Sequence, residues 1–286
     1  MPGPLVSADW LVQNEADPAV HVIEVDDEKT AGAYAQGHIP GATQLVLQTQ
    51  LEDQVARDFS NAEEVAAVLV ERGVNDGDTV VLYNLGPVTE GGIAAVYAYW
   101  VLKLRGANVE AAILDGGSQA WVAAGQSLTT AVPVVTPGAV TAGDGDPTIR
   151  IGRSPILSSL EGGNLRLLDV RTAGEYRGQL AAPPDASQDI VMRTGHIPDA
   201  QNLLWSDALT AEGQFMPVPE LEELYAGWLG ADGPAIVTYC LRGERGVVSW
   251  FVLHELLRQA STALYDGSWT EWGNLVEAPV DKAPSG

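Results

Sequence analysis

The segment AIVTYCLRGERG, residues 235–246, decides the fold prediction for this chain of 286 residues. Its first five residues are apolar, β-branched or aromatic and follow Gly233-Pro234, a pattern that predicts a short buried strand. A largely apolar run over residues 247–257 predicts a helix. The loop between them contains two glycines and begins with Cys240, the one cysteine of the chain. The segment therefore predicts a strand, a loop and a helix with a thiol at the start of the loop.

The surroundings of Cys240 favour a nucleophile. A strand–loop–helix turn aims the backbone N–H groups of the loop and the positive end of the helix dipole at the centre of the loop. Arg242 and Arg245 flank that centre. A thiol in this field is expected to be partly or largely thiolate near neutral pH. The alternative is a lone cysteine that serves as a small buried hydrophobic residue.

Four segments of the second half follow one another in an order typical of one protein family. They are LLDVR at 167–171 with EYRG at 175–178, GHIP at 195–198, the loop that begins at Cys240, and YDGSW at 265–269. Together they resemble the rhodanese (thiosulfate:cyanide sulfurtransferase) family, and the resemblance covers nearly the whole chain. The six-residue loop of that family would run here from Cys240 to Arg245.

The chain also repeats itself. VIEVD at 22–26 matches LLDVR, GHIPGA at 37–42 matches GHIPDA at 195–200, and TVVLYN at 79–84 aligns with the strand that ends at Cys240. Each half alternates β-branched runs with helical stretches, which predicts an α/β fold with a parallel sheet and helices on both faces. The resemblance implies two rhodanese-like domains, each with a five-stranded, mainly parallel sheet.

We expect the domains to span residues 1–128 and 149–286, with an extended linker over 129–148 that is rich in Val, Pro, Gly, Thr and Ala. The second half carries about 13 extra residues, which are assigned to a surface loop over Gln179–Arg193. The second domain is predicted to be catalytic.

The first domain is predicted to be catalytically silent. Asn84 stands at the position of Cys240, and an amide cannot act as a sulfur nucleophile. Asp26 stands at the position of Arg171, which reverses the local charge. The expected task of this domain is to close one side of the pocket, with a position remote from the site as the alternative.

The resemblance implies covalent catalysis without a cofactor. The Cys240 thiolate would accept the outer sulfur of thiosulfate as a persulfide, and a thiophilic acceptor such as cyanide or a thiol would remove it. The persulfide loop, Leu241 to Gly246 with Gly243 and Glu244, would stabilise the charged sulfur through its N–H groups. Gly243 and Gly246 would let the backbone approach closely.

Three arginines are candidates for substrate binding. Arg242 is predicted to hold the sulfonate end of thiosulfate. Arg245 closes the loop, where it either contacts the substrate or forms a structural salt bridge. Arg171 is expected at the same crevice, unless it forms an ion pair with Glu175 or Glu244. Some family members have a basic substrate contact where Glu175 stands here.

The loop sequence bears on three other functions. Two arginines in the loop favour an inorganic donor, with 3-mercaptopyruvate as the alternative. Phosphatases of the same fold have a C-x5-R loop, and the loop here is one residue shorter. A non-enzymatic sulfur-carrier or regulatory module is possible for this fold, and the sequence leaves open a protein acceptor for the sulfur.

Composition excludes several partners. The formal net charge of −23 disfavours binding to nucleic acid and to anionic membranes. No signal peptide is recognised, and the longest apolar run (residues 93–102) is too short to span a bilayer. A cytoplasmic protein is therefore expected. Four histidines and one cysteine show no metal-ligand spacing. His38 and His196, in matching turns, are expected to be structural.

Overall fold

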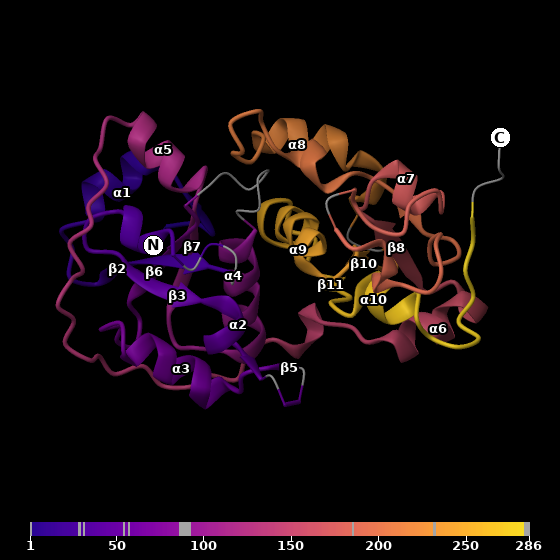
Figure 1. Ribbon diagram of the computed structural model, residues 1–286, viewed down its shortest axis with the longest axis horizontal. Coiled ribbons are helices and arrows are strands. Elements are labelled where there is room, and N and C mark those ends of the chain that lie inside the picture. The colour runs from indigo at the N-terminus through magenta and orange to yellow at the C-terminus, as the bar shows by residue number, and fades with distance from the viewer. Residues whose placement is uncertain are drawn as a thin grey trace. The chain divides into compact units, whose positions relative to one another are not determined.

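The computed structural model describes residues 2–27, 30, 32–53, 55–56, 58–85, 93–184, 186–230 and 233–282. The chain divides into two compact units, each of which is built from two stretches of sequence (Figure 1). The first unit comprises Met1–Pro147 with Leu209–Phe215, and the second comprises Thr148–Ala208 with Met216–Gly286.

The first unit is built on a five-stranded sheet with the order β1-β7-β6-β2-β3 and parallel pairing throughout. This confirms the predicted sheet. Its strands are β1 (Leu5–Val6), β2 (Val20–Asp26), β3 (Thr43–Val46), β6 (Thr79–Tyr83) and β7 (Glu110–Leu114), and a separate antiparallel pair is formed by β4 (Glu52–Asp53) and β5 (Asp58–Phe59).

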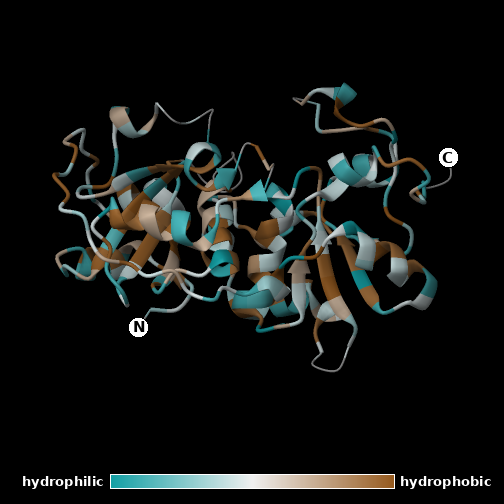
Figure 2. Ribbon diagram, turned by 90° about the horizontal axis from the view of Figure 1, so that it is seen from below, coloured by the Kyte–Doolittle hydropathy of each residue, from teal (hydrophilic) through white to brown (hydrophobic). Residues whose placement is uncertain are grey.

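Helices cover both faces of this sheet because alternate strand residues are apolar on each side. Val22 and Val81 form one core cluster with Leu11 and Trp121 of the helices that cover that face. The helices of the unit are α1 (Ala8–Asn14), η1 (Tyr34–Gln36), α2 (Leu47–Gln50), α3 (Ala62–Val70), α4 (Ala94–Arg105) and α5 (Gly117–Ala123). Figure 2 shows the apolar strands enclosed between more polar helices.

The second unit has a parallel sheet of four strands with the order β11-β10-β8-β9. The expected fifth strand is reduced to one parallel bridge between Arg150 and Leu264, because the chain turns into helix at Arg153. The prediction of five strands was therefore wrong for this unit. The strands are β8 (Leu165–Asp169), β9 (Gln201–Asn202), β10 (Ala235–Tyr239) and β11 (Thr262–Leu264).

The predicted strand over residues 235–239 is confirmed as β10. The helix that follows it begins at Glu244, three residues earlier than predicted, and its last turn is π-helical (η7, Val252–Leu256). The other helices of the unit are α6 (Arg153–Gly162), α7 (Ala173–Tyr176), η4 (Gln188–Ile190), η5 (Trp205–Ala208), α8 (Val218–Leu224), η6 (Ala226–Trp228), α9 (Glu244–Phe251) and α10 (Ser268–Trp272), and η3 (Pro147–Ile149) lies at the boundary of the two units.

The segment expected as a linker, residues 129–148, is extended but hydrogen-bonded to the first unit. The N–H of His38 donates to the carbonyl of Thr129 at 2.9 Å, and the N–H of Thr129 donates back at 2.8 Å. A Cβ at Gly138 would collide with the carbonyl oxygen of Val74, so only glycine allows this approach. The boundary between the units falls after Pro147.

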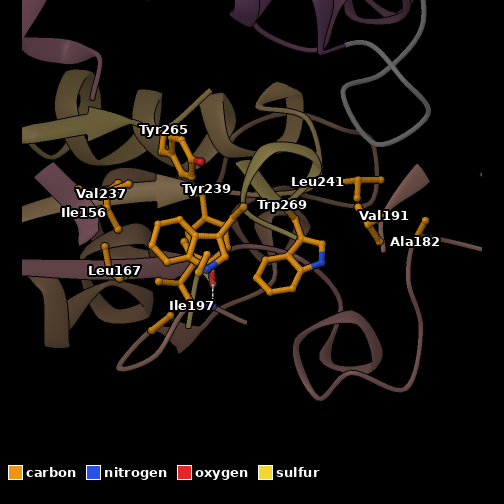
Figure 3. Packing of buried hydrophobic residues seen from close by; sticks show 13 residues of the cluster. Ile156, Leu167, Ala182, Val191, Ile197, Val237, Tyr239, Leu241, Tyr265 and Trp269 are labelled. Carbon is orange, nitrogen blue, oxygen red and sulfur yellow. Dashed lines mark hydrogen bonds between the residues drawn. The ribbon is translucent and has the colours of Figure 1, made fainter. Parts of the chain in front are cut away.

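The insertion at residues 179–193 contributes to the core of the second unit instead of lying only on its surface. Ala182 and Val191 are buried, and both belong to the same core cluster as Leu241 in the loop that follows β10 (Figure 3). At its end, Arg193 donates to backbone carbonyls after α10, among them that of Leu275 at 2.6 Å. No helix in the described part of the chain is long and apolar enough to cross a membrane.

Candidate active site

The loop that follows β10 is held in place through its carbonyl groups. The carbonyl of Cys240 accepts the N–H of Trp269 at 3.1 Å, and that of Leu241 accepts the N–H of Thr270 at 2.9 Å. The N–H of Cys240 donates to Oγ of Ser268 at 3.1 Å. Ser268 has a positive φ of 51°, a conformation that costs free energy for a residue other than glycine. The first turn of α10 therefore fixes the start of the loop.

The N–H groups of the loop are left available. Among the described residues, none of the backbone N–H groups of residues 241–246 has a hydrogen-bond acceptor, and the first one in use is that of Val247, which donates to Gly243. Consecutive free N–H groups at the start of a helix form a cradle for negative charge. Because Cys240 is buried next to this cradle, a charge on its sulfur would be stabilised without competition from bulk water.

Two glycines make this shape possible. Gly243, which precedes α9, has a φ of +88°, a region that side chains disfavour. A Cβ at Gly246 would lie 2.8 Å from Cδ1 of Leu264 and 3.4 Å from Cα of Tyr239. The first glycine turns the chain and the second lets α9 pack closely against β10.

Arg245 forms a two-pronged ion pair with Glu175. Nη1 donates to Oε2 at 2.9 Å and Nη2 donates to Oε1 at 2.8 Å. The pKa of Arg245 lies above its usual range, because burial lowers it less than the hydrogen bonds with Glu175 and the charges of a Cys240 thiolate and of Glu175 raise it. Arg245 therefore lies within electrostatic reach of Cys240 and has a carboxylate partner of its own.

The sequence reasoning missed Glu175 as a site residue. Its side chain is fully buried, and Oε2 also accepts the hydroxyl of Thr172 at 2.8 Å and the N–H of Thr172 at 3.1 Å. Burial raises the pKa of Glu175. The hydrogen bonds and charge of Arg245, together with the hydrogen bonds from Thr172, lower it by more, so the net shift of the pKa is downward. The T-x-x-E spacing of a helix capping box at residues 172–175 was the available signal.

Arg171 is fully buried, and its partner is Asp169 instead of the expected Glu175 or Glu244. Nη2 donates to Oδ2 of Asp169 at 2.6 Å and to the carbonyl of Gly195 at 2.6 Å. These contacts support a structural role, in which Arg171 joins the end of β8 to the GHIP turn. Donor binding by Arg171 is a prediction that these contacts do not test.

Arg242 differs from the other two arginines. Its side chain is 47% exposed, and its Nη2 lies 3.5 Å from Oε2 of Glu244, which is equally exposed. An exposed pair of this kind contributes about 0–1 kcal/mol and is easily exchanged for another anion. Arg242 is therefore available to a substrate at the surface end of the loop.

Among the described residues, the first unit has neither a thiol nor an arginine at the positions that correspond to Cys240 and Arg171. The side chain of Asn84 donates to the carbonyl of Val25 at 2.7 Å and accepts the N–H of Ala95 at 2.9 Å, so it ties β6 to α4. Asp26 is buried where the second unit has Arg171. The stretch that follows Asn84 contains no arginine, and most of it, residues 86–92, lies outside the described residues.

The two histidines of the GHIP turns have matching structural contacts. The rings of Tyr34 and His38 stack at 3.8 Å, as do those of Tyr176 and His196, and each Nδ1 lies within 2.8 Å of a tyrosine carbonyl oxygen. Within the described ranges no group of three or more His, Cys, Asp and Glu residues could hold a metal ion.

Comparison with known proteins places the chain in a family. The model of the rhodanese-like domain matches twice, over residues 7–124 and 155–275. The sulfur carrier protein TtuD of Thermus thermophilus is 40% identical over 284 residues, which cover 98% of this chain and 97% of that protein. A protein of Saccharopolyspora erythraea with the provisional name thiosulfate sulfurtransferase is 40% identical over 278 residues, 97% of this chain and 95% of that one.

Among solved structures, the match to the 3-mercaptopyruvate enzyme SseA from Escherichia coli covers 94% of this chain and 100% of the SseA chain. Its TM-score is 0.75 at 24% sequence identity, so the likeness concerns the fold. The chain therefore belongs to the rhodanese-like family and contains two rhodanese-like domains.

Proposed function

We propose that this protein is a sulfurtransferase that moves the sulfane sulfur of thiosulfate to a thiophilic acceptor through a persulfide on Cys240. One observation carries the proposal. Cys240 stands at the start of a loop whose carbonyl groups are held by α10 and whose following N–H groups have no acceptor among the described residues. Such a cradle fits one charged sulfur atom.

The reaction takes two displacements at sulfur. The Cys240 thiolate attacks the outer sulfur of thiosulfate, a new S–S bond forms, and the old S–S bond breaks with its electron pair leaving on sulfite. The terminal sulfur of the persulfide, which carries one negative charge, lies against the N–H groups of residues 241–246. Cyanide then attacks that sulfur, leaves as thiocyanate, and returns the electron pair of the S–S bond to the Cys240 thiolate.

Arg242 supports thiosulfate as the donor. It is exposed at the end of the loop, it is weakly paired, and it can meet the sulfonate group while the outer sulfur enters the cradle. The name of the Saccharopolyspora relative agrees with this donor. The alternative donor is 3-mercaptopyruvate, whose carboxylate could meet the same arginine.

A second candidate concerns the acceptor. The relative from Thermus thermophilus is named a sulfur carrier, and it matches this chain over almost its full length. By this likeness, the persulfide of Cys240 would pass its sulfur to a protein thiol instead of to cyanide.

The test is a mass measurement. Incubation with thiosulfate should add one sulfur, ~32 Da, to the peptide that contains Cys240, and cyanide should remove it as thiocyanate. Cys240→Ser serves as the control and should gain no mass. If the wild-type peptide stays unmodified after incubation with thiosulfate and, separately, with 3-mercaptopyruvate, the sulfurtransferase assignment is refuted. If only 3-mercaptopyruvate modifies the peptide, the donor is 3-mercaptopyruvate and not thiosulfate.

A further inference from the structure

Carboxylates neutralise the arginines around the loop to different extents. Arg171 and Arg245 are each held by both oxygens of a buried carboxylate, on Asp169 and Glu175. Arg242 has one exposed contact with Glu244. The buried side of the cradle therefore carries almost no net positive charge from side chains, and its attraction for an anion comes mainly from backbone N–H groups.

We propose that Glu175 is a specificity-determining residue. By occupying both prongs of Arg245, it leaves a cradle that holds a singly charged sulfur but rejects doubly charged tetrahedral oxyanions such as sulfate and hydrogen phosphate. This proposal rests on the proposed function, because the charge that the cradle must hold is that of the Cys240 persulfide.

The geometry explains why Arg245 cannot exchange Glu175 for a free anion. A guanidinium group binds a carboxylate or a tetrahedral oxyanion through the same pair of parallel hydrogen bonds. Glu175 is anchored independently of Arg245, because its Oε2 also accepts both the hydroxyl and the N–H of Thr172. A soluble oxyanion would have to displace a carboxylate that is already ordered and desolvated, and removal of one partner of such a buried pair is costly.

The counterpart is Arg242, whose partner Glu244 is 47% exposed and lies 3.5 Å away. The two arginines of the loop are thus assigned opposite tasks. Arg242 can bind the sulfonate outside the cradle, while Arg245 is kept from binding it inside. The shorter loop is therefore accompanied by a second, electrostatic barrier against phosphate chemistry.

The experiment measures sulfate binding by isothermal titration calorimetry at low ionic strength on the full chain, and sulfate inhibition of sulfur transfer. Glu175→Gln keeps the shape of the side chain but removes its charge, and sulfate should then bind at least about tenfold more tightly, the effect of one hydrogen-bonded charge. Glu175→Asp keeps the charge but has a shorter reach, so its sulfate affinity should lie between those of the wild type and Glu175→Gln, and Glu175→Gln combined with Arg245→Gln should return to wild-type affinity.

The matched control is Glu271→Gln in the same unit. Glu271 accepts a hydrogen bond from Arg153 at 2.7 Å, and Arg153 is about as exposed as Arg242. Freeing Arg153 should not produce a comparable gain, because its side chain is half exposed and solvent weakens its attraction for sulfate. An equal gain in Glu271→Gln, or wild-type sulfate affinity in a folded Glu175→Gln, would overturn the proposal.

If Glu175→Gln does not fold, the comparison moves to Arg245→Gln and the double variant. Arg245→Gln retains the negative charge of Glu175 and should bind sulfate more weakly than the double variant, and equal affinities would contradict the proposal. Calorimetry needs no turnover, so it tests the proposal on Glu175 separately from the proposed function. If the sulfate affinities follow the expected order but the wild type forms no persulfide, only the proposed function is refuted.

Discussion

Glu24 in the first unit is predicted to make the protein less stable as pH rises. Glu24 occupies the position of Asp169, and its side chain is fully buried, but Asp26 replaces the arginine that would neutralise it. The hydroxyl of Tyr83 donates to its Oε2 at 2.5 Å, and its Oε1 has no partner among the described residues. Tyr34 and His38 are the other titratable groups in electrostatic reach.

The magnitude follows from the pKa of Glu24. Burial, followed by the charge of Asp26, raises this pKa from 4.5 to about 7, against the lowering effects of Tyr83 and His38. Between these two values the folded protein holds a proton that the unfolded chain has lost, so the free energy of unfolding falls as pH rises. From pH 5 to pH 8 the loss should be about 2.5 kcal/mol. Above pH 8 this contribution should be constant.

The assay is urea denaturation at a series of pH values from 5 to 8.5, with Glu24→Gln beside the wild type. The variant resembles the protonated side chain and should lose the contribution of Glu24 to the slope, so that it exceeds the wild type by about 2.5 kcal/mol at pH 8 but not at pH 5. Asp115, whose pKa burial raises to about 6, adds the same slope to both proteins. Glu15→Gln, at an exposed acid in the same unit, should run parallel to the wild type. Parallel curves for Glu24→Gln and the wild type would refute the reasoning.

Two further predictions concern the site. Arg242→Ala should lower kcat/KM for thiosulfate by the equivalent of about 1–1.5 kcal/mol, because the side chain is half exposed, and should lower kcat/KM for 3-mercaptopyruvate less. Steady-state kinetics measure both values, with Arg153→Ala as the control. Equal losses for both donors would assign Arg242 to loop structure. The double variant Asn84→Cys with Cys240→Ser should show no persulfide by mass spectrometry, because the sequence of residues 85–92 contains no arginine or lysine and the change would remove the bonds from Asn84 to Val25 and Ala95. Turnover by this variant would show that the first unit lacks only its sulfur.

The sequence was most informative where a local pattern determines local structure. The strand of residues 235–239, the glycine turn at Gly243 and the repeat of the GHIP turns follow from alternation, backbone freedom and short-range contacts, and all are present in the structure. The start of α9 was misplaced because Glu244 and Arg245 were assigned to the loop, although charged residues are common in the first turn of a helix.

Long-range pairs could not be predicted in the same way. Glu175 and Arg245 are 70 positions apart, and an ion pair of this separation leaves no period in the sequence. The partner of Arg171 was misjudged for a related reason. Asp169 is two residues away from Arg171 and projects from the same face of the strand end. It therefore pairs with the guanidinium group of Arg171 at shorter range than Glu175 or Glu244 could.

The placement of Leu209–Phe215 in the first unit has a consequence for the gene. The chain leaves the second unit after Ala208 and re-enters it at Met216, and the N–H of Phe215 bonds to Oδ1 of Asp115 at 2.9 Å in between. Neither unit is therefore encoded by an uninterrupted stretch of codons. Recombination at the boundary after Pro147 would therefore separate this segment from Asp115 and remove the hydrogen bond between them.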